Sequence, residues 1–264
     1  MSIIKSTIEE LNSRNEKVLS VFLTAGFPTV NKYVDIMSGI IESGGDIIEV
    51  GIPFSDPLAD GSIIQKSSHI ALENGVTLKE VFRFTEAIRK KYRTPIILMG
   101  YANPILRYGL ESFFADAKNS GADGVIIPDV PLEEYDSFFP DDKKNLDVIM
   151  LSTPASGEDR LKLIDEKSEG FVYCVSVLGT TGMRKEFSEE QLIVLQNTRK
   201  KIVNNKMMVG FGISSEANVR QVAPYCDGVI VGSVVVKSLM DSGDDDLKKT
   251  YRLVADLKAG TLNN

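Results

Sequence analysis

The feature that most constrains the fold is an alternation of short apolar runs with longer segments of helical period. Between the runs, segments such as 78–92 and 191–201 carry apolar residues three or four positions apart, as helices packed on one face do. The runs themselves lack polar alternation, which predicts a parallel sheet buried on both faces. There are eight of them, at residues 19–25, 46–52, 95–100, 124–129, 147–152, 171–177, 206–212 and 227–233.

Eight strand–helix units in a chain of 264 residues fit an α/β fold of the (β/α)8 TIM-barrel type, which we predict. A doubly wound open sheet is the alternative. The segment before the first strand predicts an extra N-terminal helix with Ile4, Ile8 and Leu11 on one side. No linker or change in composition marks a second domain, so we expect one barrel domain over residues 1–264.

Two later helices have more detailed predictions. Ser188 and Gln191 have the spacing of a capping box, which predicts a helix start just after Ser188. The segment 30–41 has a helical period that predicts a buried face made of Val30, Val34, Met37 and Ile41.

Composition excludes several classes of function. A net charge of −7 argues against nucleic acid or an anionic membrane as the main partner. His69 is the only histidine, which argues against a multi-histidine metal site, and we interpret it as an ordinary helix residue. Cys174 and Cys226 lack zinc-ligand spacing, so no metal is expected. We predict that they are buried, reduced thiols of a cytoplasmic protein, with a disulfide as the alternative. The polar N-terminus is unlike a signal peptide, and no apolar run is long enough for a membrane span.

A glutamate interrupts the second apolar run, DIIEVGI. Side chains alternate along a strand, so Ile48 and Val50 are predicted to face the helices while Glu49 faces the barrel interior. Burial there favours the neutral carboxyl, and a carboxyl of raised pKa near the C-terminal end of a barrel strand suits acid–base chemistry. The alternative is a structural carboxyl in a hydrogen-bonded core.

Two aspartates follow in the loop PFSDPLADG. Asp56 lies between Ser55 and Pro57, which is a turn context. Asp60 precedes Gly61 and has the position of an N-cap for a helix that begins near Ser62. A structural role and a functional role are equally compatible with each aspartate.

Gly-rich segments end the last two predicted strands. In many barrels the loops after strands 7 and 8, together with a short helix N-terminus, hold a phosphate group. Gly212, Gly232 and Ser233 are placed for this role. An earlier segment, LGTTGMR (178–184), has the composition of a mobile lid. Ordinary turn glycines are the alternative.

The chain resembles the alpha subunit of tryptophan synthase over nearly its whole length. The stretch GIPFSDPLADG is the most specific part of this resemblance. The segments on which the resemblance rests are LTAGFPT (23–29), EVGIPFSDPLADG (49–61), IQKSSHIALENGVT (64–77), MGYANPI (99–105), GVIIPDVPLEE (124–134), YCVSVLGTTGMR (173–184), GFGIS (210–214) and DGVIVGS (227–233).

The resemblance implies a lyase that cleaves indole-3-glycerol phosphate to indole and glyceraldehyde 3-phosphate in tryptophan biosynthesis. It implies that Glu49 protonates indole C3 and that Asp60, which stays ionised, accepts a hydrogen bond from the indole N–H. The resemblance also implies that Tyr173 lies beside Glu49 and that Phe22 packs on the indole ring. It implies that Thr181 and Gly182 belong to the lid. The residues implied to bind the phosphate are Gly182, Gly212, Gly232 and Ser233.

The resemblance also implies a partner. The family forms an alpha2beta2 heterotetramer with a beta subunit that carries pyridoxal phosphate, and indole passes between the subunits. No cofactor is expected in this chain. Asp56, Asn103 and Pro104 are expected to face the beta subunit.

Three alternatives stay open. One is another phosphate-binding barrel such as indole-glycerol-phosphate synthase or an isomerase, although no strand interior offers the catalytic lysine expected of the synthase. The second is an inactive alpha-like chain that binds and activates a beta partner. The third is a lyase that releases indole without any partner.

Overall fold

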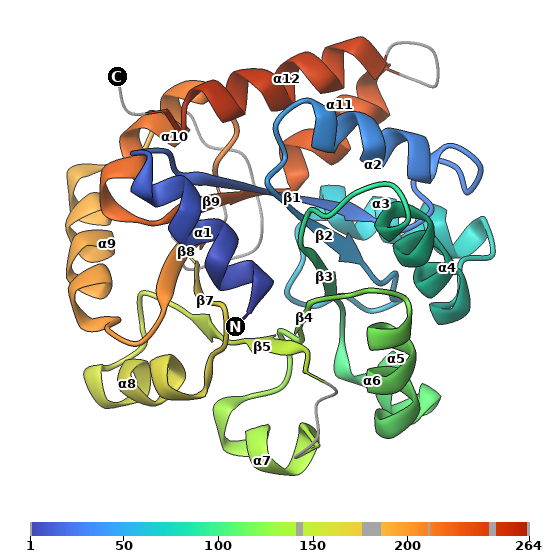
Figure 1. Ribbon diagram of the computed structural model, residues 1–264, viewed down its shortest axis with the longest axis horizontal. Coiled ribbons are helices and arrows are strands. Elements are labelled where there is room, and N and C mark those ends of the chain that lie inside the picture. Colours follow the sequence, from blue (N-terminus) through green and yellow to red (C-terminus); the bar gives the residue numbers. More distant parts are fainter. Residues whose placement is uncertain (1, 141–144, 176–185, 211, 243–246, 263–264) are drawn as a thin grey trace.

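A parallel sheet forms the centre of the computed structural model, and helices surround it (Figure 1). The structure describes residues 2–140, 145–175, 186–210, 212–242 and 247–262. All eight predicted strands are confirmed, and the fifth is divided in two. The strands are β1 (Val18–Thr24), β2 (Ile47–Gly51), β3 (Ile96–Met99), β4 (Gly124–Ile126), β5 (Asp147–Ile149), β6 (Leu151–Ser152), β7 (Phe171–Val175), β8 (Lys206–Gly210) and β9 (Gly228–Val231).

The sheet closes on itself at Met150. The strand order is β5-β4-β3-β2-β1-β9-β8-β7-β6, and only Met150 separates β5 from β6. At this residue the chain changes its hydrogen-bonding partner from β4 to β7. The Met150 N–H donates to the Ser168 hydroxyl at 3.0 Å, and its carbonyl accepts from the Tyr173 N–H at 3.0 Å. The barrel prediction is therefore confirmed, and the open-sheet alternative is wrong.

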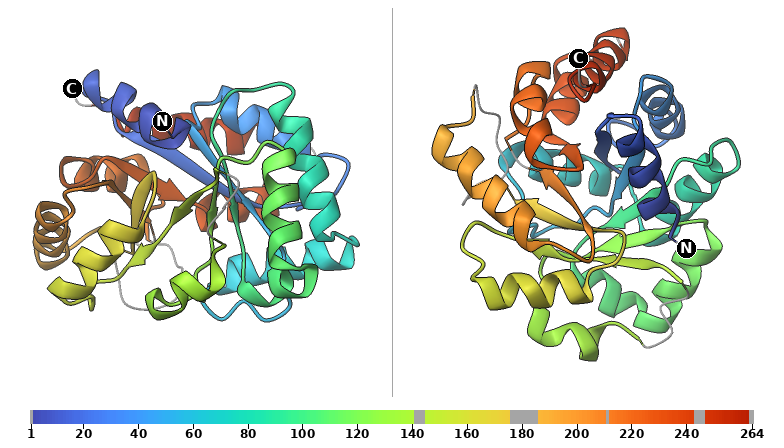
Figure 2. Two further views of the ribbon diagram at one scale, coloured as in Figure 1. Left: turned by 60° about the horizontal axis from the view of Figure 1, so that its bottom comes forward. Right: turned by 60° about the vertical axis from the view of Figure 1, so that its left-hand side comes forward.

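The helices lie outside the barrel in all three views (Figures 1 and 2). Outward-facing strand residues such as Val21, Val50 and Val172 pack in the layer between sheet and helices. No helix in the described parts of the chain is long and apolar enough to cross a membrane. The outer helices are α2 (Tyr33–Glu42), α3 (Ser62–Glu73), α4 (Leu78–Arg89), α5 (Ala102–Tyr108), α6 (Leu110–Asn119), α7 (Tyr135–Phe138), α8 (Glu158–Lys167), α9 (Glu189–Lys201), α10 (Glu216–Val222), α11 (Ser233–Ser242) and α12 (Leu247–Ala259), with single 3-10 turns η1 (Leu132–Glu134) and η2 (Ala223–Tyr225).

The capping-box prediction is confirmed, because Ser188 caps α9 and exchanges hydrogen bonds with Gln191. The predicted buried face of α2 is confirmed only at Met37 and is wrong at its other three positions. Residues 30–32 form a turn, so the helix begins at Tyr33. The Tyr33 ring packs against Phe84 with ring centroids 4.8 Å apart, and this anchor rotates the helix. The buried residues are Tyr33, Ile36, Met37 and Ile40, while Val30, Val34 and Ile41 are only partly buried.

The predicted N-terminal helix, α1 (Ile3–Ser13), covers one end of the barrel (Figure 1). Ser2 caps it by accepting a hydrogen bond from the Lys5 N–H at 3.1 Å. Ile4, Ile8 and Leu11 are buried, as predicted, and they belong to the same apolar cluster as inward-facing residues of the strands. That cluster includes Val18 at the start of β1. The helix therefore closes the amino-terminal end of the barrel, which leaves the opposite end for a site.

Shortening a buried side chain of α1 tests whether this helix closes the barrel. Ile8 is fully buried, so Ile8→Ala is expected to lower the free energy of unfolding by roughly 2–5 kcal/mol. Ile3→Ala is the matched control, because Ile3 lies on the same helix and is 39% exposed; its expected change is within about 0.5 kcal/mol. Urea denaturation measures both. Equal losses for the two variants would show that α1 does not close the barrel in this way.

Candidate active site

Glu49 lies inside the barrel, as predicted. It pairs with Phe22 in the β1–β2 register, and its side chain is fully buried. The Ser20 hydroxyl donates to Glu49 Oε1 at 2.7 Å, whereas Oε2 has no hydrogen-bond partner among the described residues. Burial raises the pKa of Glu49 to about 7, and the hydrogen bond from Ser20 lowers it in part. Near pH 7 the neutral and the ionised forms of this carboxyl therefore have similar free energies. A group of this kind can donate and accept a proton, which suits acid–base chemistry.

Two aromatic side chains line the carboxyl end of the barrel, and glycines make room for both. A Cβ atom on Gly51 would lie 2.4 Å from Phe22 Cζ, and one on Gly210 would lie 2.2 Å from the Tyr173 hydroxyl oxygen. Any larger residue at these two positions would displace the rings. Burial, and then the negative charges of Glu49 and Asp60, hold the pKa of Tyr173 well above its usual value. The structure thus brings Phe22, Tyr173, Glu49 and Asp60 together.

Asp60 is held by a tyrosine that the sequence analysis missed. The Tyr101 hydroxyl donates to Asp60 Oδ2 at 3.0 Å and accepts from the Ala59 N–H at 3.1 Å. The capping interpretation of Asp60 is wrong, because Gly61 is the N-cap of α3 and no side chain in the described part of the chain caps that helix. Burial raises the pKa of Asp60 to about 6, against the lowering effect of Tyr101. At pH 7 such a carboxyl is about 90% ionised.

The mouth of the barrel contains two cavities that share Pro128. A cavity of about 20 Å³ lies between Phe22, Asp60 and Tyr101, which is room for a single water molecule. A second cavity of about 670 Å³ extends past Leu151 to Val175. Both Leu151 and Val175 pack in the inner apolar cluster, so this cavity opens into the barrel interior. The larger cavity has mostly apolar walls and passes Ala59, the neighbour of Asp60 in the chain, so it can hold a flat, mostly apolar molecule with a polar edge.

The residues predicted to bind phosphate lie in the loops after β8 and β9, at the carboxyl end of the barrel. Gly212 follows β8 with a φ of +81°, and Gly232 lies between β9 and the first residue of α11, Ser233. A Cβ on Gly232 would lie 3.2 Å from Phe22 Cβ, so this turn adjoins the aromatic wall. The N-terminus of a helix attracts anions. Thr181 and Gly182, the predicted lid residues, lie outside the described residues.

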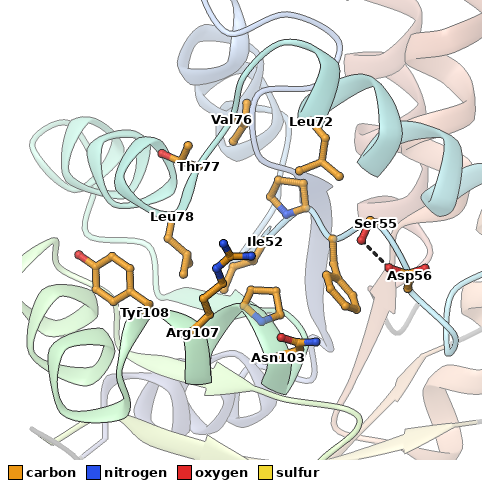
Figure 3. A pocket seen from close by; sticks show the side chains of 13 residues that line it. Ile52, Ser55, Asp56, Leu72, Val76, Thr77, Leu78, Asn103, Arg107 and Tyr108 are labelled. Carbon is orange, nitrogen blue, oxygen red and sulfur yellow. Dashed lines mark hydrogen bonds between the residues drawn. The ribbon is translucent and has the colours of Figure 1, made fainter.

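Asp56, Asn103 and Pro104 line one groove on the outside of the barrel mouth (Figure 3). Its volume is about 590 Å³, and its walls come from the loop after β2, the α3–α4 connection and α5. The Ser55 hydroxyl donates to the Asp56 carboxylate. Arg107, which the sequence analysis did not single out, extends from α5 into the groove (Figure 3). The structure therefore groups the three residues expected at a partner surface and adds a cation.

The prediction that Cys174 and Cys226 are buried thiols is confirmed, because both are buried and neither is in a disulfide. The disulfide alternative is wrong. Within the described ranges, no three histidine, cysteine or acidic side chains gather in a way that could hold a metal ion.

Comparison with known proteins finds one family along the chain. The family model "Tryptophan synthase alpha chain" matches residues 8–262. The tryptophan synthase alpha chain of Petrotoga mobilis is 44% identical over 249 residues, which is 93% of this chain and 96% of the relative. That of Geotalea uraniireducens is 42% identical over 98% of each chain. A chain in a structure of Mycobacterium tuberculosis tryptophan synthase superposes with a TM-score of 0.91 at 34% identity, covering 100% of this chain and 99% of the other.

The buried carboxyl predicts a pH-dependent gain in stability for Glu49→Gln. The pKa of Glu49 is about 7 in the folded chain against an ordinary 4.5. Its contribution to stability is fully present below pH 4.5 and is lost as the pH rises through 7. The neutral variant avoids this loss, so at pH 8 its free energy of unfolding should exceed that of the wild type by about 3 kcal/mol. Below pH 4.5 the two should agree.

Urea denaturation between pH 4 and pH 8 measures this difference. Glu111→Gln is the control, because Glu111 is exposed on α6 and its replacement removes the same charge. A pH-independent difference for Glu49→Gln would contradict the raised pKa.

Proposed function

The chain belongs to the tryptophan synthase alpha chain family, and on this premise we propose which of its residues perform the reaction. Members of the family are lyases that cleave indole-3-glycerol phosphate to indole and glyceraldehyde 3-phosphate in tryptophan biosynthesis. Breaking the C3–C1′ bond needs protonation of indole C3, since the indole ring is otherwise a poor leaving group. The observation that carries the proposal is the fully buried carboxyl of Glu49, whose Oε2 has no hydrogen-bond partner among the described residues.

Glu49 is the acid and, in the next step, the base. As the proton passes from its carboxyl to C3, the ring becomes a cation centred on N1. The electrons of the C3–C1′ bond then return to the ring, and C1′ becomes an aldehyde as its hydroxyl loses a proton. That proton returns to the Glu49 carboxylate. The protons balance within one side chain and the substrate, so the cycle needs no cofactor in this chain.

Asp60 stabilises the cation by accepting a hydrogen bond from the indole N–H. The group must be ionised for this role, and its pKa of about 6 makes it so at pH 7. Tyr101 fixes the carboxylate by its hydrogen bond to Oδ2. Phe22 and Tyr173 form the walls against which the flat ring packs. The two carboxyls thus take different protonation states for different tasks.

The phosphate end of the substrate belongs in the turns after β8 and β9. Gly212 and Gly232 offer backbone N–H groups, and Ser233 offers a hydroxyl at the N-terminus of α11. Thr181 and Gly182 complete this proposal as parts of a lid that closes over the substrate. Anchoring the phosphate at one side of the barrel mouth sets the distance of the ring from Glu49 and Asp60.

The groove in Figure 3 is the proposed docking surface for a beta subunit. Asp56, Asn103 and Pro104 line it beside the loop that carries Asp60. A partner seated there contacts that loop directly, which links partner binding to the position of the carboxylate. The proposal includes a heterotetramer of two alpha and two beta subunits, pyridoxal phosphate in the beta subunit, and a cytoplasmic location.

Indole release tests the catalytic proposal. The purified chain receives indole-3-glycerol phosphate with and without a beta subunit, and indole is quantified by absorbance or chromatography. We expect Glu49→Gln to lower kcat at least 1,000-fold, because it cannot supply the proton, and Asp60→Asn roughly 100-fold. Beta-subunit activation by Glu49→Gln should persist. Indole release by Glu49→Gln at the wild-type rate would overturn the assignment.

The same assay separates the alternatives. Wild-type release that is independent of a beta subunit identifies a stand-alone lyase. Activation of a beta subunit without any release identifies a binding chain, and neither activity points to another barrel enzyme.

The docking proposal has its own test. Asp56→Ala and Asn103→Ala should each weaken binding to the beta subunit roughly 10-fold, which corresponds to about 1.4 kcal/mol. Glu166→Ala, an exposed acidic residue on α8, should leave the dissociation constant unchanged. Isothermal titration calorimetry measures all three. Equal affinities across the set would remove the groove from the interface.

A further inference from the structure

Ser20 is the one described side chain that hydrogen-bonds the proposed acid. It is fully buried on β1, and its hydroxyl donates to Glu49 Oε1 at 2.7 Å. Ser20 pairs with Ile47, whereas Glu49 pairs with Phe22. The carboxyl therefore reaches back by one layer towards the amino-terminal end of the barrel to meet the hydroxyl. Its register partner on β2, Ile47, belongs to the inner apolar cluster, so the serine places a hydroxyl in apolar surroundings.

We propose that Ser20 is a positioning residue for the reaction: its hydrogen bond engages Oε1 and assigns the transferable proton to Oε2. The inference rests on the proposed role of Glu49. In the neutral carboxyl, the oxygen that accepts from Ser20 is the carbonyl oxygen, so the proton lies on Oε2. When this proton leaves, negative charge develops on both oxygens, and the bond from Ser20 becomes charge-assisted. It therefore strengthens along the reaction, as transition-state stabilisation requires.

The other titratable groups facing Glu49 act on different parts of a pH profile. Tyr173, from β7, has a pKa well above its usual value and stays neutral throughout the working range. Asp60, from the loop after β2, has a pKa of about 6 and must be ionised, so activity rises through that pH. Glu49 must be protonated, so activity falls through about pH 7. The hydrogen bond from Ser20 affects only the pKa of Glu49, and therefore only the descending limb of the profile near pH 7.

The experiment is the pH dependence of kcat/KM for indole release by the complex with the beta subunit, which reports groups of the free enzyme. Ser20→Ala should move the descending limb to higher pH by about one unit and lower kcat roughly 10-fold, with KM and the ascending limb unchanged. Ser20→Thr keeps a hydroxyl and should restore both values. Ser20→Cys keeps the volume with a weak donor and should behave as Ser20→Ala does.

Ser152→Ala controls for the loss of a buried hydroxyl. Ser152 is 1% exposed on β6 and lies beside Cys174 in the layer outside the barrel, so its profile should match the wild type. A lower kcat in Ser20→Ala with an unmoved descending limb, or a wild-type profile in Ser20→Cys, would overturn the inference. Glu49→Gln is assayed in parallel: if it abolishes release while the Ser20 variants match the wild type, the role of Glu49 stands and that of Ser20 falls.

Discussion

The removal of one carboxyl from water is the constraint on which this molecule's chemistry depends. Glu49 is inward on a strand whose other side chains are apolar, and the barrel offers it a single described hydrogen bond. The closed sheet supplies this environment, because its strands pair on both sides and α1 covers the amino-terminal end. Without that closure, water would reach Glu49 and its pKa would fall towards the ordinary range. The fold therefore sets the protonation state of the carboxyl that we propose as the acid.

Asp60 shows how the same barrel holds a second carboxyl in another state. It lies on the loop after the strand that carries Glu49, where burial is incomplete and a phenol donates to it. The two groups differ by about one pH unit in their pKa values, about 7 and about 6. Between these values one carboxyl is largely protonated and the other largely ionised. The fuller burial of Glu49 on the strand, compared with Asp60 on the loop, is consistent with the two roles that we propose.

The sequence predicted the parts of this arrangement that follow from periodicity. All eight strands were predicted, since buried parallel strands are uninterrupted apolar runs, and strand alternation predicted the direction of Glu49. The face of α2 was not predicted, because the turn at 30–32 delays the helix and a contact from Tyr33 to Phe84, distant in sequence, rotates it. The contacts of Ser20 and Tyr101 with the two carboxyls were not predicted, for a related reason. A serine within LSVFLTA and a tyrosine within MGYANPI carry no local signal, and their roles exist only once strand register and a loop place them beside a carboxyl.

The break at Met150 gives the barrel two seams, one there and one where β1 pairs with β9. They divide the chain into two half-barrels, β1–β5 and β6–β9. Ser20, Glu49 and Asp60 all belong to the first half, while Tyr173 and the turns at Gly212 and Gly232 belong to the second. In the proposed binding mode the ring packs between Phe22 of the first half and Tyr173 of the second, and the phosphate lies in the second, so one substrate molecule contacts both halves. Its binding energy is then also energy that holds the two halves together.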